Sequence, residues 1–213
     1  YIDGMADSLD VVPIGGWRGS GRKNKWISPW LVATYDPATG VFGSVCRVMS
    51  GFSDVFYEEA TRRYLGRVLG SVDGGGADDG AAEEHDKGDD SEGLAGDDGV
   101  VVAIDASFGD GEDALGSESA RLLPRRAEGV ETGETPTFWF EPCEVWEVRF
   151  ADVTLSPVHM SACGLVCERG LSVRFPRFVR TRPDKRVEDA TTPLQLAELY
   201  LKAAGGGRDS VID

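Results

Sequence analysis

The sequence predicts a mainly β fold: a barrel of about five strands, with one helix after the third strand and another near the C-terminus. Three observations support this prediction. Apolar and polar residues alternate along several short segments, which is typical of half-buried strands. Two segments combine capping residues with the apolar spacing of a helix. A long acidic, glycine-rich segment separates the first three strands and their helix from the rest.

The first part of the predicted barrel is residues 1–70. The expected strands are Leu9–Ile14, Trp30–Tyr35 and Val41–Met49. Apolar and β-branched residues dominate all three segments, as they do in buried strands. Ser53 is a suitable N-cap for a helix over residues 54–69, because its hydroxyl can accept a hydrogen bond from the first turn. The apolar residues of that segment recur at helical spacing.

Residues 71–135 differ in composition and are expected to be a disordered acidic insert. They hold 19 acidic and 4 basic residues, so the net charge of −15 falls on this segment and the rest of the chain is neutral. A segment so rich in Gly and Asp cannot bury enough apolar surface to offset its chain entropy. The alternative is an acidic mimic of nucleic acid that competes for a basic surface.

The second part of the predicted barrel is residues 136–204, and residues 205–213 form a tail. Strands are expected at residues 143–150, where polar and apolar residues alternate, and at residues 171–175. Pro176 then ends or interrupts the second of these strands, because proline cannot donate a hydrogen bond to a neighbouring strand.

Proline in the first turn predicts a final helix over residues 194–204. His159 lies in an irregular connection and is expected to be a surface group. A helix after the third of five strands is the order of the oligonucleotide/oligosaccharide-binding (OB) fold. That fold is a Greek-key barrel whose loops and face bind single strands or backbones.

Two basic segments are candidates for phosphate binding. The glycine-rich loop of residues 15–25 carries Arg18, Arg22 and Lys23. Glycines let a backbone approach a phosphate closely, and cations neutralise its charge. Residues 171–185 carry four arginines and one lysine against a single carboxylate. For both segments the alternative is solvated surface, in the second case an edge strand protected from aggregation by its charge.

Other features exclude some classes of protein. The four cysteines are scattered and complete no zinc-binding set, so no metal site is expected. No apolar run is long enough to span a membrane. The chain opens at Tyr1 in the middle of a motif, so we expect a piece of a longer protein.

Four motifs follow one another in a fixed order along the chain. They are DSLD at residues 7–10, GGWRGSGRK at residues 15–23, ADVTLSP at residues 151–157 and RFPRFVRTRPDK at residues 174–185. In this order they resemble the C-terminal OB-fold domain of eukaryotic ATP-dependent DNA ligases, with the replicative ligases as the nearest match. The resemblance covers residues 1–70 and 136–204 but leaves out the acidic insert.

The resemblance implies roles for individual residues. Arg182, Asp184 and Lys185 match the core of motif VI, whose cations stabilise the pyrophosphate that leaves ATP. Arg174 and Phe175 match positions that press into the minor groove beside a nick. The implied DNA-binding residues are Arg174, Phe175, Arg177, Arg18, Arg22 and Lys23.

The resemblance also implies cofactors and partners. ATP and Mg²⁺ are expected, bound mainly by an adenylation domain that this chain lacks. The nucleophilic lysine lies in that domain, upstream of Tyr1, so the chain alone should be inactive. Expected partners are nicked duplex DNA, the upstream adenylation and DNA-binding domains, and a sliding clamp reached through other regions. The implied setting is the nucleus, in DNA replication, repair and recombination.

Two other functions remain open at this point. One is a free-standing OB module that binds nucleic acid, and the other is the OB domain of an mRNA capping guanylyltransferase. The RFPRF string and the ADVTLSP segment favour the ligase over both.

Overall fold

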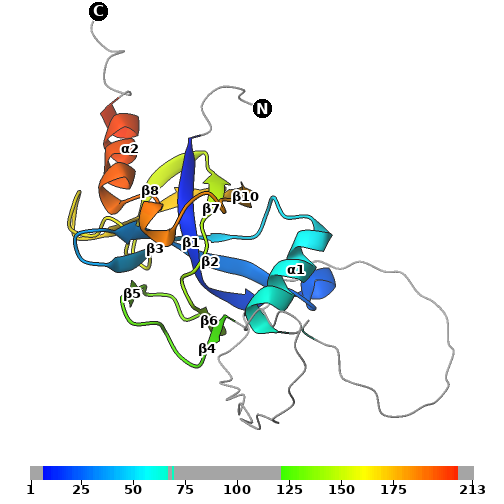
Figure 1. Cartoon of the computed structure of the whole chain (residues 1–213). Coiled ribbons are helices and arrows are strands. Elements are labelled where there is room, and N and C mark those ends of the chain that lie inside the picture. Colours follow the sequence, from blue (N-terminus) through cyan, green and yellow to red (C-terminus); the bar gives the residue numbers. More distant parts are fainter. Residues whose placement is uncertain (1–6, 67–68, 70–120, 206–213) are drawn as a thin grey trace, which may run out of the picture. The chain divides into compact units, whose positions relative to one another are not determined.

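The computed structural model describes residues 7–66, 69 and 121–205 (Figure 1). The chain divides into two compact units, one of residues 1–71 with 118–213 and the other of residues 72–117. The second unit lies outside the described residues, and so does most of the expected acidic insert. Among the helices that are described, none has both the length and the apolar character needed to cross a membrane.

The described elements follow one another as strands and helices of unequal length. The strands are β1 (Ser8–Arg18), β2 (Ile27–Asp36), β3 (Val41–Val48), β4 (Leu122–Leu123), β5 (Val130–Glu131), β6 (Phe138–Phe140), β7 (Trp146–Arg149), β8 (Asp152–Ser156), β9 (Gly170–Arg174) and β10 (Arg177–Thr181). The helices are α1 (Asp54–Leu65) and α2 (Pro193–Gly205), with short 3₁₀ turns at Gly21–Lys23 and Val187–Asp189.

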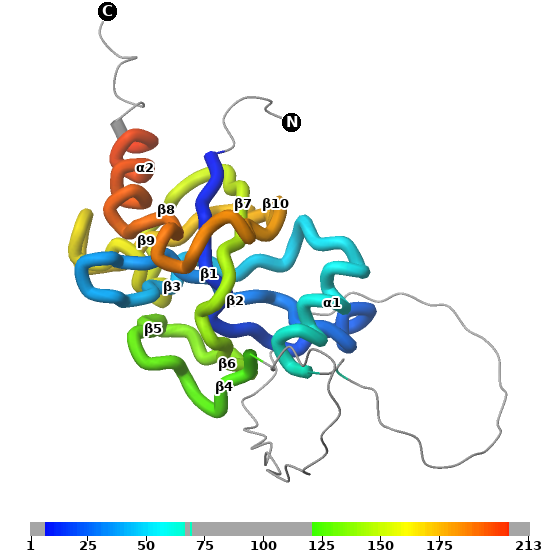
Figure 2. The backbone as a smooth tube through the Cα atoms, viewed as in Figure 1, coloured from blue at the N-terminus to red at the C-terminus, as the bar shows by residue number. Residues whose placement is uncertain are grey.

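The strands form a barrel in which β1 pairs with three other strands, β2, β6 and β7. The order across the main sheet is β10-β7-β1-β2-β3-β5, and β8 pairs with β9 in a separate antiparallel hairpin. The backbone N–H of Phe178 in β10 donates to the carbonyl oxygen of Ser50, just after β3, at 2.9 Å. This bond joins β10, at one end of the strand order, to the segment that follows β3. The tube in Figure 2 shows β10 and the segment after β3 on the same side of β1. The prediction of a mainly β, OB-like fold is confirmed.

A cluster of aromatic rings fills the barrel. The Trp30 ring lies 5.0 Å from those of both Trp146 and Tyr64, and 5.3 Å from that of Phe140. All four side chains are fully buried. Glu144 accepts hydrogen bonds from Tyr64 Oη and Trp146 Nε1, each at 2.8 Å. The polar ends of two buried rings therefore keep a partner while their carbon atoms fill the core.

Helix α1 begins where the sequence predicts and ends earlier. Ser53 Oγ accepts a hydrogen bond from the backbone N–H of Phe56 at 3.1 Å, as an N-cap does. The helix stops at Leu65 because Gly66 takes a left-handed conformation, with φ of 70°. Its N–H then bonds to the carbonyl of Arg62 at 2.8 Å. The expected helix end at residue 69 is therefore wrong, because a glycine in this conformation caps the helix and ends it at Leu65.

The glycine-rich segment was expected to be a loop, but its first four residues, 15–18, belong to β1. A Cβ atom on Gly15 would lie 2.8 Å from Pro136 Cγ, and one on Gly16 would lie 2.5 Å from Ile27 Cγ2. These glycines therefore permit close packing of β1 inside the barrel. The basic loop that remains begins after Arg18, at the end of β1.

The expected acidic insert is too long at its C-terminal end. Strand β4 pairs with β6, and β5 runs parallel to β3 through the pair Phe42 and Val130. Figure 1 shows β4 and β5, in green, below β3. These strands are only two residues long, and their stability comes from pairing with distant strands, which composition does not reveal.

His159 is buried, against the expectation of a surface position. Its side chain is 7% exposed, and Nδ1 lies 3.3 Å from Ser44 Oγ. Burial lowers the pKa of the imidazole, although the negative charge of Glu134 opposes this effect. The buried ring therefore favours the neutral form.

Candidate functional site

The motif VI residues predicted from the sequence lie together just after β10. Arg182 Nε and Nη2 donate to the carboxylate of Asp184 at 3.0 and 2.8 Å, which is a bidentate contact. The backbone N–H of Lys185 donates to the carbonyl of Arg182 at 3.0 Å. A tight turn therefore brings both cations to one place, and Asp184 orients the guanidinium.

A carboxylate of the DSLD motif, to which the resemblance assigned no role, lies between these cations. Asp10, on β1, accepts from Arg182 Nη1 at 3.0 Å through Oδ1 and from Lys185 Nζ at 2.6 Å through Oδ2. Glu147, opposite Asp10 on β7, accepts from Arg180 Nε at 2.8 Å and lies 3.9 Å from Arg182 Nη1. We call the six residues Asp10, Glu147, Arg180, Arg182, Asp184 and Lys185 the motif VI cluster.

The motif VI cluster balances three cations with three carboxylates. The hydrogen bond from Arg182 lowers the pKa of Asp184 to about 2, and the same bond raises the pKa of the Arg182 guanidinium. The Asp10 and Arg182 side chains are only 16% and 17% exposed. Asp10 and Arg182 therefore meet in a partly buried part of the cluster, while Asp184 is more exposed.

The predicted minor-groove pair lies at the turn between β9 and β10. Phe175 has φ of 54°, an unusual conformation for a residue other than glycine, and it is 73% exposed. Arg174 Cζ lies 5.1 Å from the centre of the Phe175 ring. Ser50 Oγ donates to the carbonyl of Pro176 at 2.9 Å, which ties the turn to the end of β3. The turn thus holds an apolar ring in solvent beside a cation.

Arg18, at the end of β1, and Arg22 and Lys23 of the basic loop make different contacts. Lys23 Nζ donates to the carbonyl of Met49 at 3.0 Å and to Tyr57 Oη at 2.9 Å. Arg18 Nε donates to the carbonyl of Asn24 at 3.0 Å. Arg22 is largely exposed, and its Nη2 atom lies 3.7 Å from Asp54. Of the three predicted residues, Arg22 is therefore the most available to a ligand.

Arg177 faces another arginine across the sheet. In the pairing of β10 with β7, Arg177 lies directly opposite Arg149, and both are exposed. Like charges directly opposite each other destabilise a sheet unless an anion lies between or above them. Within the described residues, neither arginine has a carboxylate at ion-pair distance. Sequence reasoning did not single out Arg149, because only strand register places it beside Arg177.

Direct contacts join the basic loop to the aromatic turn. Lys23 bonds to the carbonyl of Met49, and the next residue, Ser50, bonds to the carbonyl of Pro176. We call Arg22, Lys23, Arg149, Arg174, Phe175 and Arg177 the basic face. Five-residue β10 separates the aromatic turn at Phe175 from Arg182, and a strand of that length spans about 16 Å.

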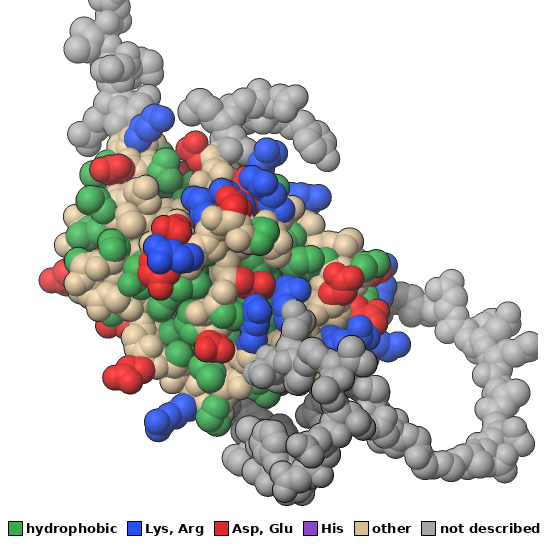
Figure 3. Space-filling view, viewed as in Figure 1, with side chains coloured by type: hydrophobic (Ala, Val, Ile, Leu, Met, Phe, Trp, Pro, Cys, Tyr) green, Lys and Arg blue, Asp and Glu red, His purple; other side chains and the backbone are tan. Residues whose placement is uncertain are grey.

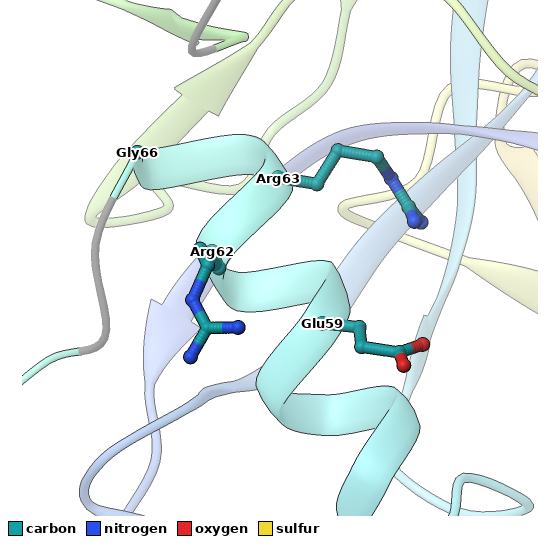
Figure 4. A pocket seen from close by; sticks show the side chains of 4 residues that line it. All are labelled: Glu59, Arg62, Arg63 and Gly66. Atoms are coloured by element: carbon teal, nitrogen blue, oxygen red, sulfur yellow. The ribbon is translucent and has the colours of Figure 1, made fainter. Parts of the chain in front are cut away.

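Elsewhere the charges are mixed in sign. On the side of the barrel seen in Figure 3, Lys and Arg side chains are interspersed with Asp and Glu. A pocket at the C-terminal end of α1 is lined by Glu59, Arg62, Arg63 and Gly66, with the two arginines extending to different sides of the helix (Figure 4). None of the predicted site residues lines this pocket. In the described part of the chain, no three side chains of the metal-ligating types come together.

Comparison with known proteins identifies the family. The model of the "ATP dependent DNA ligase C terminal region" matches residues 112–185, about a third of the chain. DNA ligase 6 of Arabidopsis thaliana is 38% identical over 201 residues, which cover 94% of this chain and 11% of that protein. DNA ligase 3 of Schizosaccharomyces pombe is 39% identical over 202 residues, which cover 94% of this chain and 20% of that protein.

The DNA ligase 1 of A. thaliana is 31% identical over 201 residues, covering 94% of this chain and 19% of that protein. The comparisons thus show the family without distinguishing the replicative ligases within it. The chain spans about a tenth to a fifth of the length of these three relatives. The chain belongs to the ATP-dependent DNA ligase family and corresponds to its C-terminal region.

Proposed function

We propose that the full-length protein joins nicks in duplex DNA with ATP, and that this barrel serves two different steps. The observation that carries the proposal is the placement of two groups at opposite ends of β10. Arg182 and Lys185 follow the strand, whereas Arg174 and Phe175 precede it. By turning, one barrel can present cations to a nucleotide in the first step and the basic face to DNA later.

In the first step, a lysine outside this chain attacks the α-phosphorus of ATP. A P–N bond forms, and pyrophosphate leaves with growing negative charge. Arg182 and Lys185 stabilise this charge by hydrogen bonds, which count most in the transition state. Mg²⁺ supplies further charge neutralisation when it is bound. The described residues bring no metal-ligand set together, so we assign its binding to other parts of the protein.

In the later steps, AMP passes to the 5′-phosphate of the nick, and the 3′-hydroxyl then displaces AMP as the strand is sealed. The exposed Phe175 ring enters the minor groove beside the nick and deforms the duplex. Arg174 and Arg177 contact phosphates on either side of it. Arg149 and Arg22 extend these contacts along the backbone, where binding does not depend on sequence.

Labelling and sealing assays test this function. The full-length protein should become covalently labelled by α-labelled ATP and should seal a nicked duplex, whereas chain 1–213 alone should do neither. Labelling by GTP in preference to ATP would instead identify a capping guanylyltransferase. Binding to nucleic acid without labelling by either nucleotide would favour a free-standing OB module.

We further propose that the protein acts in the nucleus, in replication, repair and recombination of DNA. Upstream adenylation and DNA-binding domains, and a sliding clamp, are the expected partners. The support for this setting is that the relatives named above are eukaryotic DNA ligases. Fluorescent tagging of the full-length protein tests the location, and co-purification with a clamp ring tests that partner.

A further inference from the structure

We infer that Asp10 is a positioning residue that fixes Arg182 and Lys185 at the spacing needed to receive the pyrophosphate of ATP. The inference rests on the proposed function, because it assigns a role within the adenylation step. It concerns a residue on β1, more than 170 positions before motif VI in the sequence.

The first argument is that one carboxylate holds both cations. Oδ1 of Asp10 accepts a hydrogen bond from Arg182 Nη1, and Oδ2 accepts one from Lys185 Nζ. The two oxygens of one carboxylate have a fixed separation, so the two nitrogen atoms are held at a defined spacing. A pyrophosphate likewise presents several oxygens at fixed separations, which is the kind of ligand that such a pair of cations can meet.

The second argument is that Lys185 depends on Asp10 more than Arg182 does. Asp184 also accepts two hydrogen bonds from the guanidinium of Arg182. For the ammonium of Lys185, the only side-chain partner among the described residues is Asp10. A lysine side chain has four rotatable bonds, so without Asp10 its ammonium would sample many positions.

The third argument is that Asp10 is itself rigidly held. Its backbone N–H donates to Thr191 Oγ1 at 2.9 Å, and its carbonyl accepts from the N–H of Thr191 at 2.8 Å. It also lies within the β1–β7 pairing, opposite Glu147. The carboxylate therefore projects from a fixed backbone, as a group that orients others must.

The fourth argument is that Asp10 leaves both cations free to bind phosphate. An ammonium has three N–H donors and a guanidinium has five. Asp10 uses one donor of each, and Asp184 uses two more of Arg182. The remaining donors can bind a phosphate without breaking the contacts to Asp10, so the carboxylate orients these cations rather than blocking them.

The substitution Asp10→Asn in the full-length protein tests this inference. Asparagine keeps the size of the side chain and both backbone bonds to Thr191, but loses the charge that holds the cations. We expect kcat for self-adenylation to fall about tenfold to a hundredfold, because misplaced groups stabilise a transition state poorly. The sealing of pre-adenylated nicks should stay within about twofold of the unmodified protein.

A matched control is Asp36→Asn, which changes a partly buried carboxylate that caps the turn between β2 and β3. Its Oδ1 atom accepts from the N–H of Ala38 at 2.9 Å. Both rates should be unchanged in this variant. If Asp10→Asn slowed self-adenylation and sealing equally, Asp10 would have a general structural role and the inference would be wrong.

Single substitutions of the two cations separate this inference from the proposed function. If Arg182→Ala and Lys185→Ala slowed self-adenylation while Asp10→Asn did not, the inference would fail and the proposed function would stand. If none of the three variants slowed it, the proposed role of motif VI would fail as well.

A double substitution distinguishes positioning from a contribution to folding alone. Because Asp10 acts through the cations, Asp10→Asn should slow self-adenylation much less in a Lys185→Ala, Arg182→Ala background than in the unmodified protein. An equal loss in both backgrounds would contradict the inference.

Discussion

The ammonium of Lys185 donates a 2.6 Å hydrogen bond to Oδ2 of Asp10, a residue 175 positions earlier in the chain. The bond joins the turn after β10 to β1, the strand with the most pairing partners in the barrel. The cations of motif VI therefore take their positions from the folded barrel and not from local sequence alone. Anything that disturbs the pairing of β1, β7 and β10 should disturb these cations.

The first prediction concerns the closure of the barrel at Gly51. This residue has φ of 94°, and a Cβ atom here would lie 2.2 Å from the carbonyl oxygen of Phe178. Gly51→Ala should lower the free energy of unfolding of chain 1–213 by more than about 2 kcal/mol, because strain and a backbone clash add. Urea unfolding measures this.

Gly40→Ala is the matched control for that substitution. Gly40 also has a positive φ, 73°, but nothing lies within 4 Å of its added Cβ atom. Gly40→Ala should lower the free energy of unfolding by about 1 kcal/mol, from the backbone conformation alone. Equal losses of stability in the two variants would contradict the role of Gly51 at the closure.

The second prediction concerns the exposed ring of Phe175. In the full-length protein, Phe175→Ala should raise the Kd for nicked duplex DNA about tenfold, because a ring that contacts bases contributes about 1–3 kcal/mol. Self-adenylation should be unchanged, since the ring lies at the other end of β10. Titration with a labelled nick and an ATP-labelling assay measure the two effects.

Leu201→Ala provides a control for the removal of exposed apolar surface. Leu201 is 57% exposed on α2, away from the basic face. This variant should bind the nick with unchanged affinity. If Phe175→Ala also left the affinity unchanged, the minor-groove role of the ring would be wrong.

The third prediction concerns Arg149, which faces Arg177 across the sheet. If both bind DNA phosphates, Arg149→Ala should reduce the slope of log Kd against log salt concentration by about one. Binding should weaken equally for nicked duplexes of different sequence. Arg62→Ala removes an exposed arginine of α1 that already pairs with Glu58 at 2.8 Å, and it should leave the slope unchanged. An unchanged slope in Arg149→Ala as well would remove this residue from the basic face.

The fourth prediction concerns the pH dependence of stability at His159. Burial lowers the pKa of its imidazole below the ordinary value of 6.5, so between the two pKa values the unfolded chain binds more protons than the folded chain. The stability of the fold should therefore be fully present above about pH 7.5 and should decline as pH falls through 6.5.

His159→Gln should remove that part of the decline. Glutamine is neutral throughout this range and can still bond to Ser44. Urea unfolding at several pH values between about 5 and 8 should give a shallower fall for the variant than for the unmodified chain. Identical pH profiles would show that His159 does not contribute to the decline.

The sequence is informative wherever a local signal controls the structure. Ser53 marks the start of α1, and alternation in the residues of β7 predicts a half-buried strand, because capping and burial act over a few residues. The three motif VI residues lie together for the same reason, since a tight turn joins Arg182 to Lys185.

The site residues that the sequence did not predict lie where they do because of strand register, which sequence patterns do not give. Asp10 meets motif VI because β1 pairs with β7, which pairs with β10. Arg149 meets Arg177 for the same reason. The glycines of β1 are similar, since Gly15 is required by the side chain of Pro136, far away in the sequence. Each of these features depends on a contact between segments that are distant in sequence. Local sequence patterns therefore do not predict it.

The most direct test of the two-step account is Arg182→Ala in the full-length protein, with self-adenylation and the sealing of pre-adenylated nicks measured on one preparation. The account predicts a loss of self-adenylation of about a hundredfold or more, because a group that stabilises the leaving pyrophosphate is removed. Sealing of pre-adenylated nicks should stay within about twofold, since no pyrophosphate leaves in that step. A fall of both rates by the same factor would contradict the assignment of Arg182 to the ATP step.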